Sequence, residues 1–126
     1  MDIEYLTSEA TKSLNLPFSE AVRVDNMLYL SGMIGIKPDT MELASGGIAE
    51  ETKQTLENIR SVLERYGSSL NQVIKCTVMM ADMNEWADMN AVYVPYFPDH
   101  LPARSAFGTT GLALGARVEI ECIATV

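Results

Sequence analysis

The stretch "ARVEIECIATV", residues 116–126, is the most strand-like part of this chain, and its composition decides the fold. Side chains alternate between the two faces of a strand. One face holds only apolar residues: Val118, Ile120, Cys122, Ala124 and Val126. The other face is mixed: Arg117, Glu119, Glu121, Ile123 and Thr125. Because both faces carry apolar side chains, the strand predicts a sheet covered by helices on one face and by another copy of the chain on the other.

The segments before this strand alternate between strand-like and helical patterns. Apolar and β-branched runs between turn residues predict strands at Ala21–Val24, Met27–Ser31, Val73–Met80 and Ala103–Phe107. A turn at Asp25-Asn26 joins the first two of them. The expected order is β-β-α-β-α-β-β, which is an α+β fold with one sheet and both helices on one face.

Two helices are expected between these strands. The first follows the glycines of "ASGG", residues 44–47, and ends at Gly67. Its apolar face repeats every three or four residues: Ile48, Thr52, Leu56, Ile59, Leu63 and Tyr66. Asp82 can cap the second helix, and Pro95 should kink or shorten that helix near its end. The apolar stripe of the second helix is Trp86, Met89, Tyr93 and Phe97.

Size and composition indicate one folded domain over residues 1–126. Hydrophobic residues make up 48 % of the chain, which suffices for a core. No apolar run approaches the roughly 20 residues of a membrane span. The first residues, "MDIEYLTSEATK", lack the apolar segment of a signal peptide. We expect a cytoplasmic protein without a membrane partner.

The charge of the chain argues against nucleic acid as a partner. Nine basic and seventeen acidic residues give a net charge of −8, and the basic residues form no cluster. Such a field repels phosphate backbones. One well-placed arginine could still bind a small anion, because a local contact can outweigh a screened global field.

The residue types argue against a metal site and against a catalytic triad with a serine or cysteine nucleophile. Cys76 and Cys122 lie in apolar strand-like runs, where reduced core cysteines are expected. His100 is the only histidine, so no ligand cluster for a metal is expected. A serine or cysteine triad would have to use His100, which lies in the proline-flanked loop "FPDHLP".

Three short segments carry a resemblance to a known family. They are "LYLSGMIG" at residues 28–35, "PARSAFG" at 102–108 and "VEIECIA" at 118–124, with an N-x-x-Y helix motif at Asn90. From about Leu16 onward the chain resembles the RidA family of reactive intermediate deaminases. The resemblance implies a chorismate-mutase-like fold, a homotrimer with active sites between subunits, and no cofactor or metal. It also implies hydrolysis of enamines and imines, such as 2-aminoacrylate, to 2-keto acids and ammonia.

The resemblance also implies roles for individual residues. Arg104 would hold the substrate carboxylate with its planar fork, which lysine lacks. Strand periodicity leaves Glu119 and Glu121 equally plausible as a base, and the family spacing of fifteen residues after the arginine selects Glu119. Glu119 would orient and deprotonate the attacking water. The backbone carbonyl of Ala106, where some members carry cysteine, would help to hold that water.

Further residues match the lining of the family's pocket. Ser31 and Gly32 match its "SG" pair, although a glycine at a strand end can serve backbone freedom alone. Asn90 matches an asparagine that faces the site. Trp86 is either part of the site or an ordinary core residue of its helix. Two departures make the pocket more apolar and suggest a bulkier or less polar imino acid: Met33 replaces a common glutamine, and Phe18 replaces a common tyrosine.

Two other functions remain open at this stage. A ligand-binding module that senses 2-keto acids or related small carboxylates could use Arg104 without turnover. A translation-inhibiting endoribonuclease, an activity attached to some relatives, conflicts with the acidic balance and the absence of a basic groove.

Overall fold

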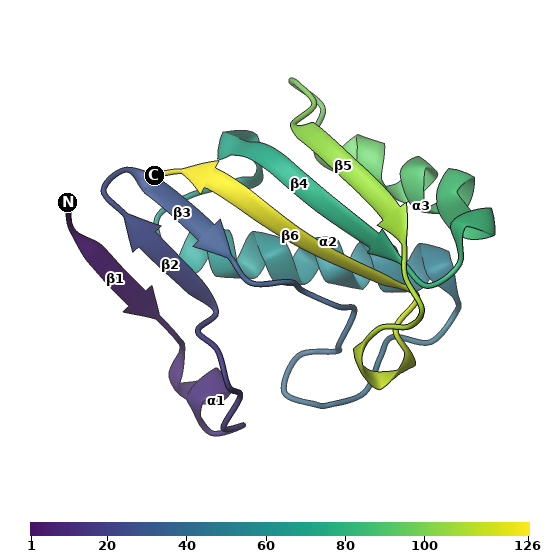
Figure 1. The fold of residues 1–126 in the computed structure, drawn as a ribbon, viewed down its shortest axis with the longest axis horizontal. Helices are drawn as coiled ribbons and strands as arrows, with labels where there is room; N and C mark the ends of the chain where they lie inside the picture. Colours follow the sequence, from purple (N-terminus) through teal and green to yellow (C-terminus); the bar gives the residue numbers. More distant parts are fainter.

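The computed structural model describes residues 1–126, and its centre is one six-stranded sheet (Figure 1). The strand order is β1-β2-β3-β6-β4-β5, and every neighbouring pair is antiparallel except β4 and β5. The strands are β1 (Ile3–Leu6), β2 (Ala21–Val24), β3 (Met27–Leu30), β4 (Val73–Met80), β5 (Ala103–Gly108) and β6 (Val118–Thr125). The closing strand of the sequence thus lies inside the sheet, between β3 and β4.

Two helices cover one face of this sheet, as the sequence predicted. They are α2 (Ile48–Arg65) and α3 (Trp86–Tyr93), which lie behind the strands in Figure 1. The apolar face of β6 packs beneath them, and Val118, Ile120, Cys122 and Ala124 are all at most 2 % exposed. The α+β fold is confirmed. None of the helices combines the length and the apolar character that crossing a membrane requires.

The end of α2 follows the expected signal, whereas α3 begins after Glu85 and, contrary to the prediction from the sequence, is not capped by Asp82. α2 ends at Arg65, Tyr66 caps it, and Gly67 leaves it with a φ of +85°, a value that glycine adopts without strain. The second helix is shorter than its apolar stripe. Asp82 caps a 3-10 turn at Met83–Glu85 that leads into α3, and Pro95 lies in another 3-10 turn directly after it.

The expected order of elements was incomplete at its start. The strand β1 pairs with β2 at the edge of the sheet, and the short helix α1 (Glu9–Lys12) follows it. The carboxylate of Glu20, 8 % exposed, secures this segment: it accepts hydrogen bonds from the Ser8 amide (2.9 Å), the Thr11 hydroxyl (2.7 Å) and the Arg65 guanidinium (2.9 Å). These contacts join distant parts of the chain, so no local pattern predicts them.

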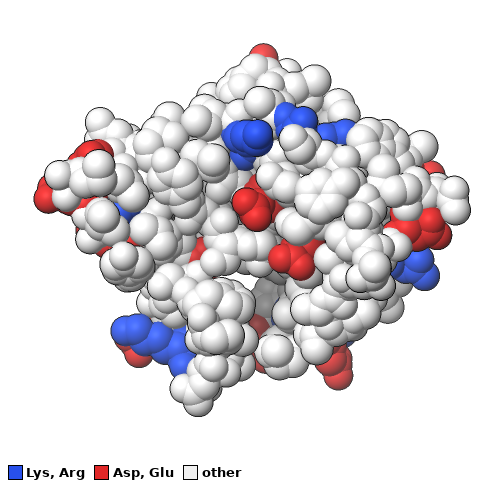
Figure 2. Space-filling model, in the orientation of Figure 1, with Lys and Arg blue, Asp and Glu red and all other residues white.

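The face of the sheet opposite the helices has no cover within the single chain. Tyr5, Tyr29 and Phe107 are 74, 43 and 47 % exposed, and cross-strand pairing places Tyr29 beside Ile123 on this face. Figure 2 shows it from the front: acidic side chains lie near its middle, basic side chains lie just above them in this view, and most of the remaining surface is uncharged. This is the two-faced sheet that the closing strand predicted.

Candidate active site

Arg104 lies on the edge strand β5, and three residues of α3 hold its guanidinium group. Its Nη1 donates a hydrogen bond to Asn90 Oδ1 at 2.7 Å. Its Cζ lies 4.8 Å from the ring centroid of Tyr93 and 5.1 Å from that of Trp86. Trp86, Asn90 and Tyr93 follow one another at helical spacings of four and three, so they share one face of α3. The side chain of Arg104 is therefore fixed before any ligand binds.

The charge of Arg104 is not neutralised within the chain. Arg60 pairs with Glu57, Arg65 with Glu20, and Arg117 with Glu85 and Glu51, but no carboxylate forms an ion pair with Arg104. Aromatic faces attract a cation without cancelling its charge. The remaining N–H groups of Arg104 can therefore bind an anion.

A cavity of about 290 Å³ opens beside this arginine. Its lining residues are Asn90, Tyr93, Val94, Leu101, Pro102 and Arg104. Two polar groups stand against a largely apolar wall, an arrangement that fits a small molecule with one charged end. Arg104 can bind a carboxylate in two-point fashion here, because its planar fork matches the two oxygens.

Tyr93 lines the candidate site although the sequence did not single it out for that role. Its place in the apolar stripe of the helix indicated a core residue, and it is indeed only 3 % exposed. The same ring also stacks on Arg104. The N-x-x-Y spacing was the available signal, since it puts Asn90 and Tyr93 on one helix face. Trp86 is half-buried against Arg104 and does not belong to the hydrophobic core cluster, which favours its site role.

Glu119 lies on the open face of the sheet. Cross-strand pairing sets it beside Met79 of β4. A Cβ atom at Gly32 would overlap its Oε2, so the absent side chain at position 32 makes room for the carboxylate. Partial burial raises the pKa of the Glu119 carboxyl, and the negative charge of Glu121 raises it further. A carboxyl with a raised pKa suits proton transfer near neutral pH.

The other residues matched in the N-terminal half gather around Glu119. The Met33 amide and carbonyl pair with Ile120, the residue next to Glu119. The Ser31 hydroxyl donates to the Ser19 carbonyl at 2.6 Å, which ties the loop carrying Phe18 to the end of β3. Phe18 is 52 % exposed. Gly32 and Met33 thus lie beside the carboxylate, and Ser31 precedes them along the chain.

The arginine and the glutamate lie on opposite faces of the sheet. Arg104 pairs laterally with Cys76 of β4, which pairs with Cys122 of β6 on the helix-covered face. Glu119 is three residues from Cys122, so strand alternation turns it to the other face. Ala106 lies two residues beyond Arg104 and shares its face. Within a single chain, one small ligand therefore cannot contact both Glu119 and the pair formed by Arg104 and Ala106.

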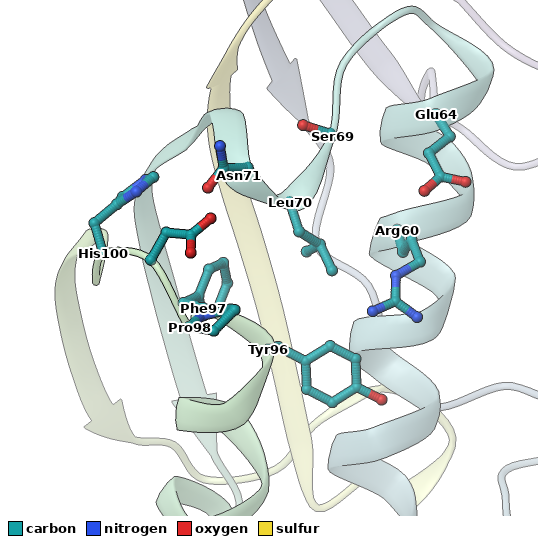
Figure 3. A pocket seen from close by; sticks show the side chains of 10 residues that line it. Arg60, Glu64, Ser69, Leu70, Asn71, Tyr96, Phe97, Pro98 and His100 are labelled. Carbon is teal, nitrogen blue, oxygen red and sulfur yellow. The ribbon is translucent and has the colours of Figure 1, made fainter.

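A second cavity, of about 280 Å³, lies on the helix side of the molecule (Figure 3). It lies between α2, the 3-10 turn at Leu70–Gln72 and the loop after α3, and its lining includes His100 and Ser69. The Ser69 hydroxyl donates to Gln72, and the exposed His100 makes no hydrogen bond. A histidine-activated nucleophile is therefore not assembled here. No group of three His, Cys, Asp or Glu residues could hold a metal ion.

Comparison with known proteins gives a consistent result. The model of the Endoribonuclease L-PSP family matches residues 8–126. The 2-iminobutanoate/2-iminopropanoate deaminase of Mus musculus is 45 % identical over 108 residues, which cover 86 % of this chain and 80 % of the mouse protein. The structure of YyfA from Yersinia pestis, a protein of unknown function in the conserved Rid family, is similar with a TM-score of 0.91 and 35 % identity, covering 99 % of this chain and 100 % of that one. TdcF of E. coli with bound serine has a TM-score of 0.82 and 31 % identity, covering 88 % of this chain and 89 % of that chain.

Proposed function

The chain belongs to the Endoribonuclease L-PSP family, which includes the Rid proteins, and on that premise we propose that it hydrolyses 2-imino acids and their enamine tautomers to 2-keto acids and ammonia. The observation that carries this proposal is the uncompensated Arg104 beside a small, largely apolar cavity. The mouse relative is named for the same reaction on imines of three- and four-carbon acids.

Arg104 supplies binding and orientation. It holds the substrate carboxylate through two parallel N–H···O contacts and thereby fixes the plane of the adjacent C=N bond. Asn90 occupies one guanidinium nitrogen, and the two aromatic rings limit rotation of the group. The bound serine named for the E. coli relative also carries a carboxylate, which is consistent with such a contact.

Glu119 supplies the base. Water attacks the imine carbon while the Glu119 carboxylate takes one of its protons, and a C–O bond forms as the C=N π pair moves to nitrogen. With the imine nitrogen protonated at the outset, the attack gives a neutral carbinolamine, and the Glu119 carboxyl passes its proton to the amine nitrogen. The C–N bond then breaks as the carboxylate takes the hydroxyl proton, so that the keto acid forms and the departing ammonia receives that proton as ammonium. The Ala106 carbonyl helps to hold the water. No cofactor is needed, because the imine carbon is already electrophilic.

This chemistry requires Arg104 of one chain and Glu119 of another. The two side chains point away from opposite faces of one sheet, and the Glu119 face is uncovered and partly apolar. We propose a homotrimer in which the edge strand β5 of one chain, with Arg104, packs against the open sheet face of its neighbour, where Glu119 lies. Such an assembly would bury Tyr29 and Ile123 as well as complete the site.

Two features favour turnover of a small molecule over the alternatives. Burial and the charge of Glu121 raise the pKa of the Glu119 carboxyl, which suits a base in turnover more than a module that only binds keto acids. The net charge of −8 weakens attraction to RNA phosphates, so cleavage of RNA fits this surface poorly. Met33 and Phe18 offer no polar side chain near the proposed site, which favours an apolar substituent on the imino acid.

The test is direct. An amino-acid oxidase acting on alanine or 2-aminobutyrate generates the imine in place, and semicarbazide competes with the protein for it. Adding this chain should lower the yield of semicarbazone and speed ammonia release in proportion to its concentration. An unchanged yield with folded wild-type protein would refute the deaminase assignment.

A further inference from the structure

Cys76 and Cys122 face each other in the core, outside the proposed chemistry. They lie directly opposite one another on the antiparallel strands β4 and β6, with their Sγ atoms 3.4 Å apart. Both are free thiols, 0 and 2 % exposed. The sequence predicts two separate core cysteines, because no local pattern shows that residues 46 positions apart form a pair.

The backbone geometry at this pair already suits a disulfide. Directly opposed residues of antiparallel strands have Cα atoms about 4.5–5.5 Å apart. A disulfide accepts Cα separations of about 4.4–6.8 Å, and its S–S bond is about 2.0 Å long. Side-chain rotation can therefore bring the two sulfur atoms together with little movement of either strand.

The surroundings make the two thiols unequal. The hydrogen bond with Cys122 lowers the pKa of Cys76, and the nearby Tyr93 hydroxyl and the positive charge of Arg104 lower it too, against the effect of burial. The pKa of Cys122 is raised by its contact with Cys76 and by burial. The Tyr93 hydroxyl is buried without a satisfied hydrogen bond, so it is free to donate to a thiolate at Cys76.

We propose that Cys76 and Cys122 form an oxidation site, in which a peroxide converts the buried thiol pair into a disulfide between β4 and β6. The Cys76 thiolate attacks one peroxide oxygen, so that an S–O bond forms, the O–O bond breaks and hydroxide leaves. Cys122 then attacks the oxidised sulfur, the S–S bond forms, and hydroxide leaves and takes the Cys122 proton as water. The first hydroxide takes the proton that Cys76 lost on forming its thiolate, so two waters form in total. The two sulfur atoms together lose two electrons, and the peroxide gains them.

Burial determines how this site behaves. A peroxide is small enough to enter during local opening of the edge strand β5 over Cys76, whereas large thiol reductants are excluded. Oxidation is therefore slow, and the disulfide, once formed, resists dithiothreitol until the chain unfolds. The link also joins the strand that carries Glu119 to the strand beside Arg104, and it removes freedom from the unfolded chain.

The test uses the wild-type protein under native conditions. The protein is incubated with hydrogen peroxide, unfolded in iodoacetamide and weighed by mass spectrometry. We expect a species about 2 Da lighter than the unmodified chain that takes up no alkyl group. Digestion without reductant should yield one peptide pair joining residues 76 and 122. The melting temperature of the oxidised form should rise by roughly 5 °C or more.

Cys122→Ser is the matched control, because it leaves Cys76 in place without a partner. This variant should show no loss of 2 Da. Should this variant fail to fold, the peptide map and alkylation count of the wild-type protein still decide the matter. Two alkylatable thiols after native peroxide treatment, or disulfides only between chains, would overturn the proposal.

Discussion

Arg104 differs from the other buried or paired arginines of the chain in one physical respect. Arg60 also stacks on an aromatic ring, with its Cζ 5.3 Å from the Tyr96 centroid, but it forms an ion pair with Glu57. Arg104 has aromatic faces and an amide oxygen as neighbours and forms no ion pair. This contrast gives a matched pair of substitutions.

Arg104→Lys should lower kcat/KM for imine hydrolysis by about 10²-fold or more, because lysine keeps the charge but loses the planar fork. Arg60→Lys should keep kcat/KM within about twofold of wild type, because Arg60 pairs with Glu57 and does not line the cavity beside Arg104. Steady-state kinetics and circular dichroism of both variants check this. Near-normal activity of a folded Arg104→Lys protein would remove the carboxylate-binding role.

Glu119→Gln should retain binding of a non-reactive keto acid and lose turnover by about 10²-fold or more, since an amide cannot take a proton. Glu121→Gln removes one charge from the same strand face and should leave turnover at neutral pH nearly intact. Calorimetric binding and rate measurements separate the two effects. Equal losses in both variants would show a general field effect rather than a specific base.

The raised pKa of Glu119 gives the direction of two pH effects. kcat/KM should rise with pH as Glu119 loses its proton, with a midpoint above the ordinary value of about 4.3. Glu121→Gln removes one cause of the raised pKa and should move that midpoint downward. A midpoint that stays in place in this variant would contradict the coupling between the two carboxylates.

The raised pKa of Glu119 also makes the stability of the fold depend on pH. A salt bridge would lower the pKa of a carboxyl and stabilise the fold at neutral pH, whereas this raised pKa does the reverse. The fold favours the protonated Glu119 carboxyl, so its deprotonation destabilises the folded state once the pH exceeds the unfolded pKa of about 4.3. Glu119→Gln should therefore be more stable than wild type at pH 7, and the difference should vanish as the pH falls toward about 3. Denaturant unfolding across this pH range measures it.

At the scale of elements, two nearby glycines make room for different neighbours: Gly32 for a side chain and Gly35 for the backbone of a helix. Gly32 follows β3, and a Cβ there would meet only the flexible end of Glu119. Gly35 lies against the backbone of α2, where a Cβ would approach the Glu51 carbonyl oxygen to 2.7 Å. The first contact concerns the site, and the second concerns the packing of a helix on the chain before it.

Gly32→Ala should therefore reduce turnover by about tenfold or more at little cost in stability, because the Glu119 side chain can move aside. Gly35→Ala should destabilise the fold by about 1–3 kcal/mol, because backbone cannot yield so easily. Activity assays and denaturant melts on both variants test the pattern. A reversed pattern would mean that Gly32 serves only the strand end.

At the scale of the whole molecule, the open face of the sheet and the separated site residues lead to one expectation. Light scattering at micromolar concentration should give three times the chain mass of 13.8 kDa. Mixing inactive Arg104→Lys with inactive Glu119→Gln chains, after unfolding and refolding together, should restore part of the activity, because some sites then contain both intact residues. A monomeric mass, or no recovery in mixed trimers, would contradict sites shared between chains.

The sequence by itself determined the features that depend on local periodicity. Alternation along residues 116–126 separated the core face of β6 from the face of Glu119, and helical spacing fixed the buried side of α2. The motifs around Gly32, Arg104 and Glu119 identified the family that the comparisons confirmed. These features can be predicted because the direction of each side chain in a helix or strand depends only on its spacing from nearby residues.

Only the tertiary structure decided which distant segments meet. The buried Glu20 joins the segment after β1 to α2, and the stacking of Tyr93 on Arg104 depends on how α3 lies against β5. The pairing of Cys76 with Cys122, and the placement of Arg104 and Glu119 on opposite faces, follow from the register of three strands. Register is set by packing of the whole sheet, and one residue of slip would reverse every face, so no short stretch of sequence contains it.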